Sequence, residues 1–209
     1  MYLFSSKKQK HRAGFSLVEL LVSITIVTAI LGFIIFNQAK YTSDSILANT
    51  ADSIGLSISE AQVYSVSVKG VSTNDFSSGY GIVFNVSSSS GGRDAYLSFA
   101  DKNNNGVYEN SWACGIGPIS ECLGKIYLPV GYLINDLCEM SLGGAETCGI
   151  GRVDISFVRP YTDAHIYFFD ANGAPLSYSD VKGARIKVSS PTGRTMSVVV
   201  YNTGQVSIQ

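Results

Sequence analysis

The sequence lacks the residue patterns of most enzymes. Of its two histidines, His11 and His165, only the second lies beyond the basic N-terminal segment, so a nucleophilic triad would depend on one side chain. The P-loop, the G-x-G-x-x-G pattern and the H-E-x-x-H pattern are all absent. Paired carboxylates stay open, although nothing in the sequence singles out a pair. We expect no enzymatic activity and interpret His165, which precedes Ile166 in an expected strand, as a structural residue.

Charge is also scarce, since Asp, Glu, Lys and Arg make up 15% of the 209 residues. Four of the fifteen basic residues lie in the first fourteen positions, so loss of that segment would leave 11 basic and 16 acidic residues, a net charge of −5. Such a product has no general attraction to nucleic acid or to acidic membranes. We interpret the basic residues beyond position 150 as solvated surface, with a DNA-binding patch as the alternative; they are Arg152, Arg159, Lys182, Arg185, Lys187 and Arg194.

Cysteine is limited to four residues within 35 positions: Cys114, Cys122, Cys138 and Cys148. No C-x-x-C pair occurs, and a zinc site would need four thiolates at an unusual spacing. Disulfides are more typical of an exported domain. Of the three pairings we favour Cys114–Cys122 and Cys138–Cys148, because each closes a short loop that contains glycine. The sequence alone leaves the pairing open.

One long apolar run occurs, and it lies at the N-terminus. Phe15 to Phe36 form 22 residues with a single charge, Glu19, and as a helix they would span about 33 Å, enough to cross a bilayer. The basic residues before it predict a cytoplasmic N-terminus, with everything after Lys40 outside. An ordinary signal peptide has small residues after its apolar stretch. Here Ala13-Gly14 come before it, so cleavage after Gly14 would keep the helix.

Glu19 is unusual because a carboxylate within a membrane segment costs about 2.5–3.5 kcal/mol on insertion scales. One interpretation is a charge tolerated near the membrane interface, where the cost is smaller. The other depends on cleavage, which would free the α-amino group of Phe15 four residues before Glu19. In a stack of parallel helices, the carboxylate of one subunit would meet the ammonium group of another and fix the axial register.

The residues His-Arg-Ala-Gly14-Phe15-Ser-Leu-Val-Glu19 resemble the class III signal of type IV prepilins and type II secretion pseudopilins. That pattern has a short basic leader, Gly, Phe, Glu at the fifth mature position and an apolar helix, and the resemblance covers roughly residues 7–36. It implies that prepilin peptidase cuts between Gly14 and Phe15 and N-methylates Phe15, and that Glu19 assists assembly. Many major pilins have a helix-distorting proline here. This helix has only Gly32 as a weak point, which leaves partial unwinding during assembly open.

The helix is expected to continue beyond the membrane segment, because residues 38–59 contain no proline. Apolar residues recur at spacings of 4, 3, 4 and 3, and they are Leu47, Ala51, Ile54, Ile58 and Ala61. Asp44, Asp52, Glu60 and Gln62 fall mostly outside this stripe. We predict one helix from about residue 15 to 63, whose second half packs against a head domain.

After residue 70 the sequence favours β-structure. The expected strands are Gly81–Ser87, Ala95–Ala100, Lys125–Val130, Val153–Val158, His165–Phe169, Ala184–Ser189, Met196–Tyr201 and Gln205–Ile208. Asp170–Gly173 and Asn202–Gly204 are predicted hairpin turns, and Ser87–Gly92 a flexible loop. The fold class is therefore α+β, a long N-terminal helix packed on an antiparallel β-sheet head. The expected parts are a cleaved leader (1–14), a transmembrane or filament-core helix (15–36), its amphipathic continuation (37–69) and the head (70–209).

A candidate calcium loop runs from Asp101 to Glu109. Oxygen-bearing residues at alternate positions followed by glycine match the first half of a calcium loop. The expected ligands are Asp101, Asn103, Asn105, the backbone of Val107, and Glu109. Trp112 stands where the usual bidentate glutamate would be. The alternative is an ordinary Asn/Gly-rich turn.

The sequence indicates a structural subunit, a minor pilin or pseudopilin, of a type IV pilus or type II secretion-like filament. The helix end Ser57–Ala61 and the closing hairpins 187–193 and 197–204 weakly resemble subunits related to pseudopilin H. Alternatives are a major pilin, a filament-tip subunit for adhesion or DNA uptake, and a single-pass protein whose leader is never cut. Expected partners are prepilin peptidase, other pilin or pseudopilin subunits, the inner-membrane assembly platform and, before assembly, membrane lipid, with DNA not favoured. The expected location is the cytoplasmic membrane, followed by an envelope or surface filament.

Overall fold

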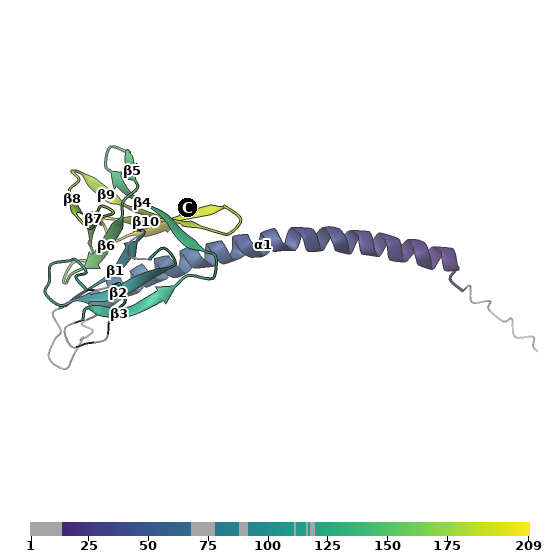
Figure 1. Cartoon of the computed structure of the whole chain (residues 1–209), viewed down its shortest axis with the longest axis horizontal. Coiled ribbons are helices and arrows are strands. Elements are labelled where there is room, and N and C mark those ends of the chain that lie inside the picture. Colours follow the sequence, from purple (N-terminus) through teal and green to yellow (C-terminus); the bar gives the residue numbers. More distant parts are fainter. Residues whose placement is uncertain (1–13, 68–77, 88–91, 111, 116, 118–119) are drawn as a thin grey trace, which may run out of the picture. The chain divides into compact units, whose positions relative to one another are not determined.

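The computed structural model describes residues 14–67, 78–87, 92–110, 112–115, 117 and 120–209. The chain divides into an anchor unit, Met1–Tyr41, and a head unit, Thr42–Gln209. One long helix, α1 (Leu17–Val66), contributes residues to both units (Figure 1). The leader before Gly14, most of the expected 87–92 loop and the expected boundary between residues 69 and 70 lie outside the described residues.

Among its described residues, the anchor unit consists mainly of the first part of α1. Leu17–Ile35 is a span of 19 residues that is long and apolar enough to cross a membrane, with a length of about 28 Å at the rise of an α-helix. Its apolar side chains are exposed, as for a helix that lacks its lipid or protein surroundings. The helix is continuous through Gly32.

The second part of α1 provides one side of the head's core. Leu47, Ala51, Ile54, Ile58 and Ala61 are all buried, with at most 5% of each residue exposed. They follow the 3.6-residue period, so one stripe of the helix faces the sheets. The predicted core stripe is confirmed.

The head contains two antiparallel sheets. Six strands in the order β3-β2-β1-β6-β7-β8 form the first sheet, and five in the order β11-β10-β9-β4-β5 form the second. The strands are β1 (Gly79–Asn85), β2 (Ala95–Asp101), β3 (Cys122–Tyr127), β4 (Leu133–Ser141), β5 (Glu146–Cys148), β6 (Arg152–Phe157), β7 (Ala164–Phe169), β8 (Pro175–Leu176), β9 (Val181–Ser189), β10 (Thr195–Tyr201) and β11 (Val206–Ile208).

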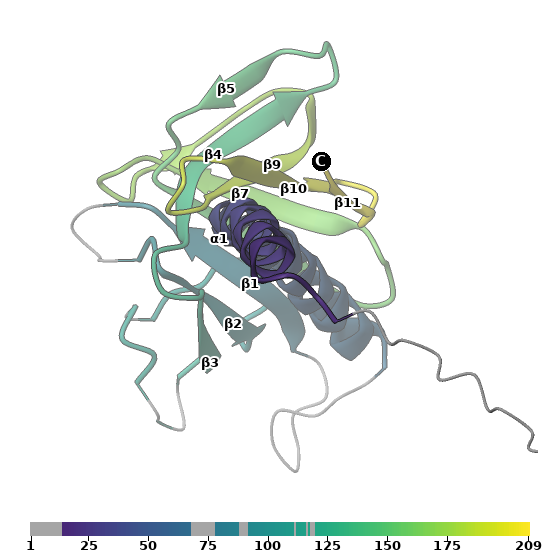
Figure 2. The same ribbon diagram turned by 90° about the vertical axis from the view of Figure 1, so that its right-hand side faces the viewer.

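The main core lies where α1 meets both sheets. Figure 2 shows the helix end on, with β9 and β10 on one side and β1 and β2 on the other. Residues of the helix stripe pack with Ile82 and Ile155 of the first sheet and Ile186 and Val198 of the second. A smaller cluster lies on the outer face of the first sheet, where Tyr108 covers Val83, Leu97 and Phe99.

The α+β class and the antiparallel pairing are confirmed, and the described strands of the head form two sheets. Three strands, β4, β5 and β8, are not among those expected from the sequence. In β4 the polar residues Asp136 and Glu139 and a bulge between Ile134 and Asp136 interrupt the apolar alternation. Glu139 is nevertheless buried, and burial raises the pKa of its carboxyl group. β5 and β8 have three and two residues, too few to show a period.

Candidate functional site

The predicted processing and assembly residues lie at the start of α1. Gly14 and Phe15 precede the first helical residue, Leu17, and Glu19 lies in the first turn. A carboxylate is favoured there because the backbone N–H groups of a first helical turn carry partial positive charge. Phe15 and Glu19 are exposed. Within the described part of the chain, the Glu19 carboxylate makes no hydrogen bond or ion pair.

Residues 9–35 match the family model of the prokaryotic N-terminal methylation motif. The chain carries a class III signal. The matched segment contains Gly14, Phe15 and Glu19 and ends at Ile35, the last residue of the apolar span. Comparison with curated proteins and with solved structures finds no match.

The methylation motif marks pilin-type structural subunits, and its presence at residues 9–35 supports a type IV pilin-like or pseudopilin-like subunit. The resemblance seen in the sequence is confirmed at this level. The motif implies processing by prepilin peptidase and assembly with other pilin subunits, and with the apolar helix it fits a single-pass membrane anchor. The match ends before the head unit begins, so the role of the head rests on its own geometry.

Two disulfides cross-link the head unit. Cys114 bonds to Cys122, and Cys138 bonds to Cys148 across the paired strands β4 and β5. Their Cα atoms are 5.3 and 4.0 Å apart. Among the described residues no cysteine is free, so no thiolate remains for a zinc ion.

The predicted calcium loop begins at Asp101, the last residue of β2, which is fully buried. Its two carboxylate oxygens accept hydrogen bonds from the backbone N–H groups of Asn105, at 3.1 Å, and Gly106, at 2.7 Å. The side-chain oxygen of Asn103 also accepts from the N–H of Asn105, at 3.1 Å. Gly106 has a φ of +80°, and a Cβ atom there would lie 2.6 Å from the Tyr167 ring, so only glycine fits.

Glu109 closes this loop. Its carboxylate accepts hydrogen bonds from the side-chain amides of Asn103, at 2.9 Å, and Asn105, at 2.6 Å. Val107 donates its backbone N–H to the Asn105 side-chain oxygen at 2.8 Å. The structure therefore brings all five residues expected to bind calcium into one hydrogen-bonded network.

Glu121 is the residue that the sequence analysis missed. It lies just before β3, is only 4% exposed, and accepts the backbone N–H of Glu109 at 3.1 Å. Burial raises the pKa of the Glu121 carboxyl group, and the nearby charges of Asp101 and Glu109 raise it further, against hydrogen bonds from backbone groups of Glu109 and Lys102. A third carboxylate thus borders the loop through its hydrogen bond to the backbone of Glu109. No local spacing rule would find it.

The three carboxylates are not gathered as tightly as in a preformed site. Among the His, Cys, Asp and Glu residues that the structure describes, three ligand atoms lie within 4.8 Å of one another only at Asp136, Cys138 and Cys148. Two of those atoms are disulfide sulfurs. For calcium to bind at residues 101–109, Glu109 would have to release the two asparagine amides and turn toward Asp101.

We predict that calcium binds this loop weakly, with a Kd of about 10⁻⁴–10⁻³ M, the range of extracellular modules. Millimolar calcium should raise the thermal midpoint of the full chain in detergent, because binding to the folded state stabilises it. The affinity should fall as the pH falls, because the raised pKa of Glu121 leaves more of it protonated. Glu121→Gln should abolish the shift.

The control for this experiment is Glu146→Gln, which removes an exposed carboxylate in β5 and should leave the calcium effect unchanged. Calorimetry on the same samples measures the heat of binding directly. Absence of heat with millimolar calcium would leave the ordinary turn as the correct interpretation.

The basic residues considered for DNA binding mostly form ion pairs. Arg152 pairs with Asp154, Arg185 with Glu146, Lys187 with Asp136 and Arg194 with Asp44. These four carboxylates neutralise part of the local positive potential that phosphate binding requires. His165 lies exposed on β7, opposite Ser156 of β6.

Proposed function

We propose that the chain is a minor pilin or pseudopilin, a structural subunit of a type IV pilus or type II secretion-like filament. Prepilin peptidase would cut between Gly14 and Phe15 and methylate the new α-amino group. The apolar part of α1 would then hold the subunit in the membrane, with the head outside, until it enters the filament and packs against the same helix of its neighbours.

One observation carries this proposal: Gly14, Phe15 and Glu19 stand at the class III spacing at the start of an unbroken apolar helix. An ordinary signal peptide would lose its apolar segment on cleavage, whereas a cut at this position retains it. The retained helix is predominantly apolar between Leu17 and Ile35, so we expect lipid or other apolar helices to surround it.

The processing step has a direct test by mass spectrometry of the N-terminus. The chain isolated from cells that contain prepilin peptidase is expected to begin at Phe15 and to carry one added methyl group. Gly14→Val should block the cut, because the bulky side chain occupies the position at which the class III pattern has glycine. Gly32→Val, which alters the other glycine of the motif segment, should leave processing unchanged.

A wild-type chain that still begins at Met1 in such cells would overturn the proposed function. The assignment as a minor subunit is tested separately. We expect the chain to be scarce in sheared filaments relative to a major pilin. Predominance of this chain in the filament, with loss of all filaments on deletion, would make it the major subunit.

A further inference from the structure

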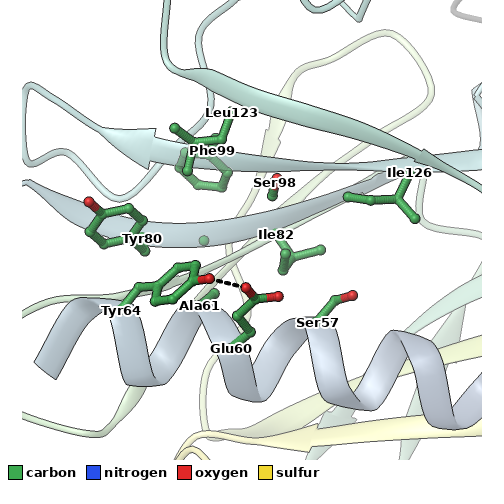
Figure 3. A pocket seen from close by; sticks show the side chains of 11 residues that line it. Ser57, Glu60, Ala61, Tyr64, Tyr80, Ile82, Ser98, Phe99, Leu123 and Ile126 are labelled. Atoms are coloured by element: carbon green, nitrogen blue, oxygen red, sulfur yellow. Dashed lines mark hydrogen bonds between the residues drawn. The ribbon is translucent and has the colours of Figure 1, made fainter. Parts of the chain in front are cut away.

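A cavity of about 390 Å³ lies in the head between α1 and the end of the first sheet formed by β2 and β3. Figure 3 shows Ser57, Glu60 and Tyr64 of α1 on one side and Ser98 and Ile126 of the strands on the other. Its volume is in the range of pockets that bind ligands or partner side chains. Most of its wall is apolar or aromatic, and Glu60 is its one charged group.

The strand wall of the cavity includes a small residue, Ser98, and the residue paired with Ser98 on β3 is Gly124, which has no side chain. Ser98 of β2 pairs with Gly124 of β3, and both lie on the helix-facing side of the sheet, in line with Ile82. A Cβ atom added at Gly124 would meet only the Ser98 hydroxyl, at 3.6 Å. The space beside Gly124 is therefore open, and no atom of the described head fills it.

The cavity adjoins a free sheet edge. Among the described strands β3 has β2 as its one neighbour, and its six residues make it longer than the other edge strands, β5, β8 and β11, which have two or three. Proteins commonly protect an edge strand from pairing with another chain by keeping the strand short, by placing proline in it, or by placing a lysine that points away from the sheet. β3 contains no proline, and its one lysine, Lys125, lies 5.4 Å above the Trp112 ring and 5.3 Å above that of Tyr127.

The exposed side chains of this edge are also apolar. Leu123 and Tyr127 are 49% and 65% exposed. Ile126 lines the first cavity and also a second one, of about 280 Å³, which lies closer to the N-terminus of α1. A hydrogen bond of 2.8 Å between Ser57 and Tyr96 lies between the two cavities. In an extended peptide every second side chain points to the same face. A peptide bound along β3 could therefore direct one side chain toward each of the two cavities.

Charge identifies the chemistry of the occupant. Glu60 accepts a hydrogen bond from the Tyr64 hydroxyl but forms no ion pair with any residue described in the structure. Glu60 is exposed at the cavity, and most of the residues that line the cavity with it are apolar or aromatic. A partner that covers Glu60 would exclude water from it, and a cation of that partner would then be attracted more strongly than in bulk water. A lysine or arginine with an apolar stem matches this combination.

We propose that the groove between α1 and β3 binds an extended segment of a neighbouring filament subunit. Its main chain pairs with the free edge of β3, an apolar side chain enters the cavity beside Gly124, and a lysine or arginine lies against Glu60. Strand addition of this kind obtains affinity from main-chain hydrogen bonds and specificity from side-chain pockets. The proposal rests on the proposed function, because the neighbour is another subunit of the filament.

The test is photo-cross-linking of the full chain in the cells that produce it. A photoreactive phenylalanine analogue replaces Leu123 on β3, and in a control it replaces Leu142, which is 63% exposed beyond β4 of the other sheet. The analogue at position 123 should form an adduct with a non-helical segment of another pilin-type subunit. Mass spectrometry should find Lys or Arg in the cross-linked segment.

Two variants test the roles of the cavity and the charge. Gly124→Leu adds a large side chain next to Ser98 in the cavity wall, and Glu60→Arg reverses the charge at the cavity, so each should reduce the adduct about five-fold or more, as loss of a central interface contact does. Asp52→Arg reverses an exposed charge of α1 that does not line either cavity, and it should have no effect. The thermal midpoint of each variant checks that the head is folded.

The proposal is overturned by an adduct no stronger than that of the Leu142 control, by an adduct with lipid or with a neighbour's apolar N-terminal helix, or by a yield that Glu60→Arg does not change. N-terminal mass spectrometry of the same samples distinguishes failure of the interface from failure of the proposed function. Leader removal without the adduct overturns this interface alone. Retention of the leader overturns the proposed function and the interface with it.

Discussion

Replacing Glu19 with alanine is expected to leave the chain in the membrane but to lower its amount in filaments about ten-fold or more, as expected when a buried charge loses its partner. Removal of the carboxylate makes insertion easier, since the charge itself costs free energy in lipid. The ammonium group that processing frees on Phe15 would then have no counter-charge in the filament core. The register between neighbouring helices would lose its one electrostatic constraint.

A purely local role for Glu19 predicts a different result. The carboxylate lies in the first turn of α1, where its interaction with the helix terminus contributes about 0.3–1 kcal/mol. Loss of that amount would fray one turn of a 50-residue helix and would leave assembly nearly unchanged. A large loss of assembly with normal insertion therefore indicates an interaction between subunits.

The measurement compares sheared filaments with alkali-extracted membranes by immunoblot. Leu20→Ala is the matched control, because it alters the adjacent exposed residue of the same helix without changing charge. Removal of the leader is checked in each variant, so that a processing defect is not mistaken for an assembly defect. Normal incorporation of Glu19→Ala would refute the pairing of Glu19 with a neighbour's amino group.

The helix was the part of the fold most accessible from sequence, because its two patterns are local. A continuous apolar run predicts a membrane span, and the stripe from Leu47 to Ala61 repeats with the period of the helix. Both patterns involve residues that are close together in the sequence, so they can be identified without knowing how distant segments pack. The structure places the stripe in the core as predicted.

The division of the head into two sheets was not accessible in the same way. It depends on which distant strands pair, such as β1 with β6 and β4 with β9, and such pairings leave no local period. β4 was missed because its sequence, with Asp136 and Glu139 near the middle, reads as a polar loop. The third expected strand, Lys125–Val130, was placed too late, since the pairing of β3 begins at Cys122 and ends before Pro129.

The residues of the candidate site also differ in whether a local sequence pattern could identify them. Gly14, Phe15 and Glu19 could be found because the motif is a fixed local spacing. Glu121 could not, because it reaches the calcium loop only through the return of the chain at β3. The buried pair of Arg152 and Asp154 did leave a signal, two opposite charges at alternate positions in an apolar strand, but Arg152 was interpreted as surface.

Replacing Asp154 with alanine is expected to destabilise the head by about 3–5 kcal/mol, the usual cost of removing one partner of a buried ion pair. Asp154 is fully buried, and both of its oxygens accept hydrogen bonds from the Arg152 guanidinium group, one of them at 2.7 Å. It also accepts the backbone N–H of Tyr108 at 2.9 Å, and Arg152 donates to the Tyr108 carbonyl. The variant would leave the Arg152 guanidinium group without its counter-charge and the backbone N–H of Tyr108 without its acceptor.

Denaturant unfolding of the full chain in detergent, with the disulfides oxidised, measures this loss. Glu146→Ala is the matched control, because it also removes a carboxylate from an arginine, Arg185, but in a partly exposed pair worth about 0–1 kcal/mol. The double variant Arg152→Met with Asp154→Leu should recover much of the stability, since an apolar pair leaves no unpaired charge. If Asp154→Ala costs no more than Glu146→Ala, the ion pair does not hold Tyr108 over the outer face of the first sheet, and the small cluster of Val83, Leu97 and Phe99 must be covered by packing alone.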